Sequence, residues 1–207
     1  MRIRGGMAAL LAAGMLLSAS GGAGEGWFPT WQSTPTPSPL QPDGTVFSFR
    51  GGVRWGMGPE EVRGAETGVQ MEERSQAEWS VLYSVSRVEV SRFFADLVYI
   101  FQQQKLNMIL YAFDPAEPAG SYAYLAGALS NVYGERSAGE GAEVVALMDR
   151  VYPGMYTVDT LSDVLTWQRG DGTRVFLYRQ RGGSFSVLYA SPDSWLTDNG
   201  VYITSGL

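Results

Sequence analysis

The chain consists largely of short runs in which apolar residues recur at every second position, which is the period of a β-strand. Residues 81–86 alternate in this way and predict a strand with one buried face. Residues 93–101 are apolar at nearly every position apart from Asp96, as expected for a strand covered on both faces. A polar turn at 102–104 precedes a further run at 106–113. Because the connections are short, we expect these strands to pair antiparallel.

A short helix is predicted to begin just after Gly58. Pro59 suits the first helical position, where its missing N–H has no partner to lose. Glu61 is placed to accept a hydrogen bond from the N–H of Gly58, which is half of a capping box. Met57 and Val62 have the spacing of a hydrophobic staple. The glycines that follow are expected to end this helix early.

Two further helices are expected in the middle of the chain. Between residues 121 and 133 the apolar positions fall on one helical face, with Ser121 as the N-cap and Gly134 at the stop. A weaker pattern at 143–152 predicts a short helix that ends before Pro153.

Three strands are predicted in the C-terminal third, joined by Asp-Gly and Arg-Gly-Gly turns: 164–168, 174–178 and 184–190. Together with the helices before them, these three strands repeat an order that already occurs earlier in the chain, a helix followed by three strands. The best match aligns 98–101 with 175–178, an offset of 77 residues, and 109–112 with 187–190, an offset of 78. Two tandem α-β-β-β units explain the match, and so does the composition that any two buried hairpins share. The sequence leaves both explanations open.

The first 23 residues have the layout of a secretory signal peptide. Arg2 and Arg4 precede an apolar run from residue 7 to residue 17, and small residues follow. A membrane-spanning helix needs about 20 apolar residues, and this run is shorter. We therefore expect cleavage between Ala19 and Ala23, and a location in the periplasm, the envelope or the extracellular space. The uncleaved signal segment is the one membrane contact that we predict.

The remaining chain divides by composition. Residues 24–45 are predicted to form a Pro-rich linker, because repeated prolines block helices and sheet pairing. The folded domain is expected at 46–190, with units 46–114 and 120–190 if the duplication holds, and 191–207 form a C-terminal tail. Meandering strands with separate helices predict an α+β fold, with an antiparallel sheet and helices packed on one face.

Composition removes several classes of function. The 207 residues include no His and no Cys, which excludes disulfides, Cys/His zinc sites and Ser-His or Cys-His catalytic pairs. The formal net charge of −6 argues against nucleic acid as a partner, since that binding favours a basic surface. No loop has the ligand spacing of a calcium site, and no Gly-rich motif would cradle a phosphate. We predict no metal site, no cofactor and no catalytic residue.

Paired carboxylates are the remaining resource for acid–base chemistry. A two-carboxylate hydrolase needs its groups about 5–10 Å apart across a cleft, and nothing in the sequence places a pair in this way. A hydrolase acting on cell-wall or sugar polymers is therefore the alternative hypothesis. The candidate pairs are Glu60/Glu61, Glu72/Glu73, Asp159/Asp163 and Asp193/Asp198.

Two short motifs have both a structural and a functional explanation. Trp55 suits a core anchor beside the first helix, because Trp buries a large apolar area, while ligand stacking is the alternative. Arg169-Gly170-Asp171 matches an adhesion tripeptide, but Asp-Gly between two strands is explained by a hairpin turn. We expect the structural explanation for both motifs.

Aromatic residues recur along the predicted strands. They would suit protein recognition if they lined an exposed sheet face, because Tyr is enriched at interfaces. Burial under the helices is the default for such large side chains, and we expect it for most of them. The residues are Tyr83, Tyr99, Tyr111, Phe176, Tyr178 and Tyr189.

The segment that opens the domain resembles one found in poorly characterised exported bacterial proteins. Residues 49–57 read Phe-Arg-Gly-Gly-Val-Arg-Trp-Gly-Met, and a short acidic helix begins at Pro59. The family opening reads Phe-Arg-Gly, an aliphatic residue, Trp-Gly, a small residue and such a helix. The helix end at Tyr133-Gly134 and the position of Trp167 on a strand before a hairpin are similar too.

More remotely, tandem helix-and-sheet units resemble the β-lactamase inhibitory protein and small outer-membrane assembly lipoproteins. The resemblance implies binding of protein partners through a sheet face. This chain lacks the disulfides of the first and the lipidated Cys of the second, so neither specific function is transferred. The sequence favours an exported, non-enzymatic protein-interaction module that binds through an aromatic sheet face. A carrier of apolar ligands between sheet and helices is a third hypothesis, after the hydrolase.

Overall fold

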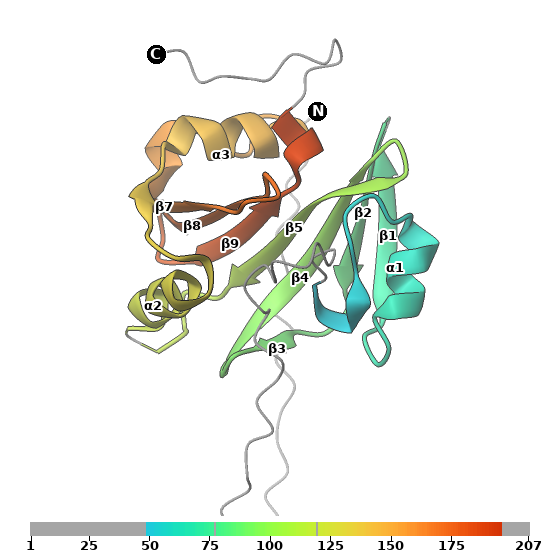
Figure 1. Cartoon of the computed structure of the whole chain (residues 1–207), viewed down its shortest axis with the longest axis horizontal. Coiled ribbons are helices and arrows are strands. Elements are labelled where there is room, and N and C mark those ends of the chain that lie inside the picture. The colour runs from blue at the N-terminus through green and yellow to red at the C-terminus, as the bar shows by residue number, and fades with distance from the viewer. Residues whose placement is uncertain (1–48, 77, 119, 196–207) are drawn as a thin grey trace, which may run out of the picture. The chain divides into compact units, whose positions relative to one another are not determined.

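The computed structural model describes residues 49–76, 78–118 and 120–195. The predicted signal peptide, the linker and most of the predicted tail lie outside the described residues. Within them the fold is α+β, as predicted from the sequence: an antiparallel sheet with helices packed against it (Figure 1).

The described strands form a single sheet of nine. Their bounds are β1 (Met71–Gln76), β2 (Trp79–Ser84), β3 (Val88–Val90), β4 (Phe93–Gln102), β5 (Lys105–Phe113), β6 (Ser137–Ala138), β7 (Leu161–Gln168), β8 (Arg174–Gln180) and β9 (Phe185–Ala190). The order across the sheet is β1-β2-β4-β5-β9-β8-β7-β6, and β3 pairs with β4. Every pairing is antiparallel, as the short connections predict.

The helices are α1 (Pro59–Ala65), α2 (Ser121–Tyr133) and α3 (Gly141–Met148), with 3₁₀ turns η1 (Arg50–Gly52), η2 (Val158–Thr160) and η3 (Pro192–Trp195). α1 begins as predicted, because the N–H of Gly58 donates to Oε2 of Glu61 at 2.7 Å. The N-cap of α2 is Gly120, with a φ of 95°, and not Ser121. The Ser121 hydroxyl turns back and donates to the carbonyl of Pro118. α2 ends at Gly134, as expected.

Helices lie on both faces of the sheet, which differs from the single covered face expected from the sequence. α1 and α2 pack on one face, here called the α1/α2 face, through Val62 and Leu125. α3 packs through Leu147 on the opposite face, here called the α3 face. Along β4 the faces alternate, so that Tyr99 lies under α1 and α2 while Ile100 lies in the α3 cluster. Figure 1 shows β7, β8 and β9 between α2 and α3.

The inner hairpins of the two halves of the sheet, β4–β5 and β8–β9, share one register. Leu97 pairs with Tyr111 in the first half, and Val175 pairs with Tyr189 in the second, so both strands are related by an offset of 78 residues. The match extends over consecutive pairs, from Asp96↔Ala112 with Arg174↔Ala190 to Ile100↔Met108 with Tyr178↔Ser186.

The offset of 77 expected for the first of these strands is wrong. It aligns Val98, which packs on the α3 face, with Val175, which lies on the α1/α2 face. A shift of one residue moves every side chain to the other face. Both strands are apolar on both faces, so their composition does not reveal which residues point to which face of the sheet.

The structure also contains strands that the apolar pattern does not predict. β1 reads Met-Glu-Glu-Arg-Ser-Gln and lies at the edge of the sheet, where charged side chains discourage pairing with other chains. The fold also continues past residue 190. The N–H of Ser191 donates to the carbonyl of Asn107 at 2.9 Å, and Nη1 of Arg150 donates to the carbonyl of Ser194 at 2.9 Å.

Trp55 connects the start of the domain to the β7–β8 hairpin. Its ring is half-buried against the α1/α2 core and meets the ring of Phe49 edge-on, with centroids 4.7 Å apart. The indole N–H donates to Oγ1 of Thr173 at 2.9 Å. The predicted role as a core anchor fits these contacts, which join segments 118 residues apart.

We expect Trp55→Ala to lower the free energy of unfolding by about 3 kcal/mol, the lower end for Trp because the ring is half-buried. Trp55→Phe keeps most of the apolar contact and loses the hydrogen bond, so a loss of about 1 kcal/mol is expected. Urea unfolding followed by circular dichroism measures both. The exposed Val85→Ala serves as control, with a change below about 0.5 kcal/mol. An unchanged transition in Trp55→Ala would contradict the anchoring role.

Candidate functional site

Most of the candidate aromatic residues lie inside the protein. Tyr99, Tyr111, Phe176 and Tyr178 are buried, and Tyr189 packs between the rings of Phe49, Tyr111 and Tyr133. Tyr83 is half-buried on the α3 face. The full set therefore does not form an exposed aromatic face.

Glu66 is a buried charge on the α1/α2 face. The exposed fraction of its side chain is 2%, its Oε2 lies 3.1 Å from Nε of Arg50, and its Oε1 accepts a hydrogen bond from the hydroxyl of Tyr99. A buried charge is costly unless it is paired, and here both oxygens have a partner. Glu66 thus fastens η1 and the end of α1 to β4.

The interior tyrosines hold their protons tightly. Burial raises the pKa of Tyr122 to about 12, and its hydroxyl donates to the carbonyl of Asp163. Because a tyrosine with a raised pKa stays protonated at neutral pH, these hydroxyls are not available as general bases. Burial is also the main cause of the much higher pKa values of Tyr99, Tyr111, Tyr178 and Tyr189.

Most of the candidate carboxylates already have a partner within the fold. Glu60 pairs with Arg63 inside α1, and Glu61 caps that helix. Glu72 and Glu73 are neighbours on β1 and so point to opposite faces, where they contact Tyr83 and Arg63 respectively. Asp163 lies 3.1 Å from Arg179, while Asp159 and Asp193 are exposed in separate 3₁₀ turns. Asp198 lies outside the described residues. These positions give the hydrolase hypothesis no support.

The Arg169-Gly170-Asp171 tripeptide forms the turn between β7 and β8. The N–H of Arg169 donates to the carbonyl of Thr173 at 2.9 Å, and the N–H of Thr173 donates to Oδ1 of Asp171 at 2.9 Å. The Arg169 side chain is buried, with its guanidinium 5.3 Å from the centroid of the Tyr133 ring. An adhesion motif requires an accessible Arg, so the hairpin explanation fits this structure.

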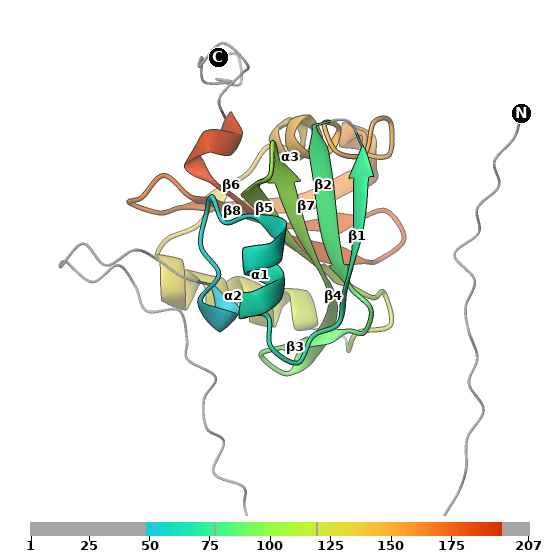
Figure 2. The same ribbon diagram turned by 90° about the vertical axis from the view of Figure 1, so that its right-hand side faces the viewer.

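An exposed aromatic surface does occur on the α3 face, in a different place. α3 lies near the upper end of β2 and β4, whereas β3 lies near their lower end (Figure 2). Toward that lower end α3 no longer covers the strands, and Phe94 is 53% exposed. Strand alternation puts four neighbours on the same face. We call the five residues the open patch: Tyr83, Phe94, Asp96, Val98 and Ala112.

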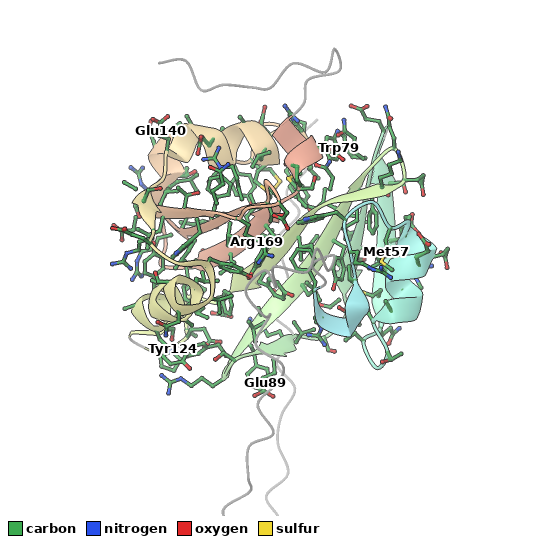
Figure 3. All side chains as sticks on the ribbon, in the orientation of Figure 1. Met57, Trp79, Glu89, Tyr124, Glu140 and Arg169 are labelled. Carbon is green, nitrogen blue, oxygen red and sulfur yellow. The ribbon has the colours of Figure 1, made fainter. Side chains whose placement is uncertain are left out.

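Acidic side chains surround the open patch. Glu72 lies opposite Tyr83 in the β1–β2 ladder, and Glu89 lies opposite Phe94 in the β3–β4 ladder. Figure 3 shows Glu89 projecting at the lower edge of the molecule. The Asp96 side chain is 59% exposed.

Two cations accompany these acidic residues. The guanidinium of Arg74 is 5.0 Å from the centroid of the Tyr83 ring. Arg87 donates from Nη2 to Oδ2 of Asp114 at 2.6 Å, while its Nε is 3.7 Å from Oδ1 of Asp96. The N–H of Ala116 and the Arg87 guanidinium hold the pKa of the Asp114 carboxyl below its usual range. Asp114 is thus the closer partner of Arg87, and Asp96 keeps access to solvent.

Sequence reasoning missed Phe94 because it lies in a run that is apolar on both faces. One signal was available: Asp96, the polar exception in that run, shares its face with Phe94 two residues earlier. A charged residue in such a strand marks where one of its faces meets water.

Comparison with protein-family models, with curated protein sequences and with solved structures finds no significant match to this chain. Within residues 49–195, as far as they are described, no three His, Cys, Asp or Glu side chains gather closely enough to hold a metal ion. In the same residues no helix has the length and apolar character needed to cross a membrane.

We expect the free energy of unfolding to fall when the pH rises above about 10, the ordinary pKa of tyrosine. The folded pKa values of the buried tyrosines are raised, so their contribution is fully present below that pH and is lost as the pH rises through the folded values. Urea unfolding at about pH 8 and about pH 11 measures the difference. Tyr122→Phe should lose less stability over this interval than the wild type, whereas Met155→Ala, which removes an exposed side chain that does not titrate, should behave like the wild type. Equal stability of the wild type at both pH values would contradict the prediction.

Proposed function

We propose that this protein is a non-enzymatic protein-binding module and that the open patch is its contact surface. The observation that carries the proposal is Phe94, a large aromatic residue that is 53% exposed on a central strand. A side chain held on a rigid strand loses little conformational freedom on binding. Aromatic residues among partly buried neighbours, such as Tyr83 and Val98, are typical of binding hot spots.

The charges around the patch favour a partner with basic residues. Glu72, Glu89 and Asp96 outnumber Arg74 and Arg87 there, and the whole chain carries a formal charge of −6. Complementary charge guides two proteins together and selects among partners.

In this proposal residues 1–23 direct export, and the protein works in the cell envelope or outside the cell. Binding accounts for the described residues better than hydrolysis does. The best-placed carboxylates serve as caps and ion-pair partners, whereas the exposed aromatic residue has no structural role of that kind.

We expect Phe94→Ala to weaken capture of the partner from an envelope fraction of the native host at least about tenfold, as for a hot-spot residue. The thermal transition should change little, because more than half of the side chain is exposed. Quantitative pull-down with the purified protein, followed by mass spectrometry, measures the capture. The matched control is Met155→Ala, which removes a side chain that is 72% exposed in the loop after α3.

Two outcomes would count against the proposal. Equal capture by Phe94→Ala and the wild type would exclude the open patch as the contact surface. No specific partner for the wild type, even after chemical cross-linking, would contradict the binding function itself.

A further inference from the structure

α3 shows how this sheet holds a helix. Val144, Leu147 and Met148 of α3 are buried in the cluster on the α3 face. In the first turn of the same helix, Glu143 accepts hydrogen bonds from both terminal nitrogens of Arg174 on β8, at 2.9 and 2.7 Å. A bidentate pair of this kind fixes orientation as well as adding energy. One apolar stripe and one ion pair therefore seat α3 on the second half of the sheet.

The open patch occupies the corresponding position on the first half. β5 and β9 pair at the centre of the sheet, and Leu110 lies directly opposite Leu188 there, its own counterpart at the offset of 78. The same offset relates three of the five patch residues to strand residues in the part of the sheet that carries α3. Its pairs are Asp96 with Arg174, Val98 with Phe176, and Ala112 with Ala190.

Among the described residues, the first half of the sheet has no helix at this position. In the second half, α3 comes from the connection between β6 and β7, residues 139–160. The connection between β1 and β2 is the topological equivalent, and it contains residues 77 and 78 alone. Phe176 and Ala190 are consequently buried, whereas Val98 and Ala112 remain half-exposed.

The charge at this position is reversed between the halves. Arg174 receives the carboxylate of Glu143, but its counterpart Asp96 is an anion with a 59% exposed side chain. A helix seated on the open patch in the manner of α3 would therefore need a cation where α3 has Glu143. The acidic residues beside the patch add to this preference.

Building on the protein-binding function above, we propose that the open patch binds an amphipathic helix of a partner protein. An Arg or Lys of that helix pairs with Asp96. Apolar residues one, four and five positions further along the helix pack on Val98, Ala112 and Phe94, as Val144, Leu147 and Met148 follow Glu143 in α3. The partner sequence thus reads Arg/Lys, apolar, two variable residues, apolar, apolar.

The test uses two synthetic peptides with the sequence of residues 139–152, one carrying Glu143→Arg and one unchanged. Each is titrated into the intact protein, and methyl NMR signals of Val98 and Ala112 report binding at the patch. We expect the Glu143→Arg peptide to shift these signals and to bind at least about tenfold more tightly than the unchanged peptide. In Asp96→Arg protein the preference should reverse. Glu89→Arg is the matched control: it reverses a charge beside the patch and leaves Asp96 in place, so the wild-type preference should weaken without reversing.

A reversal in Asp96→Arg, with its thermal transition retained, supports the proposal. Equal affinity for the two peptides, shifts that spare Val98 and Ala112, or self-association of the protein through the patch in analytical ultracentrifugation would overturn it. If neither peptide binds at the patch while Phe94→Ala still loses the native partner, the protein-binding function stands. The proposal of a helical partner with a cation is then refuted. If neither peptide binds and the pull-down returns no specific partner, the proposed binding function is refuted as well.

Discussion

The pairing of β5 with β9 is the interaction on which the rest of this structure depends. It runs from Met108↔Ala190 to Phe113↔Phe185 and joins two antiparallel blocks into one sheet. Because these strands are central, most of each face is covered, and they are apolar on both. This cover is why α1 and α2 are needed on one face and α3 on the other.

The two blocks agree in register and differ in what covers them. The β4–β5 and β8–β9 ladders match at an offset of 78, but the second block inserts α3 between β6 and β7, whereas only two residues separate β1 from β2 in the first. The open patch is the consequence of this difference. Its exposed Phe94 pairs with Glu89 of β3 and its Asp96 with Ala112 of β5, so both residues lie on backbone that is held by ladder pairing. Such a surface can present a rigid, chemically defined target without any loop.

Charged and polar groups elsewhere serve mainly to attach peripheral segments. Glu66 fastens η1 through Arg50 and meets β4 through Tyr99. Trp55 reaches the β7–β8 hairpin through Thr173, and Arg174 holds α3 through Glu143. Because the chain has no Cys, these contacts rather than disulfides connect the distant segments.

The sequence by itself determined the features that depend on neighbouring residues. The start of α1 at Gly58, the stop of α2 at Gly134 and the paired strands follow from capping chemistry, backbone preference and local periodicity. Tertiary structure alone decided the register of β4 relative to β8, the face that α3 covers and the exposure of Phe94. A strand that is apolar on both faces has no periodicity to set its phase, and the apolar stripe of a helix does not say which side of a sheet it will meet.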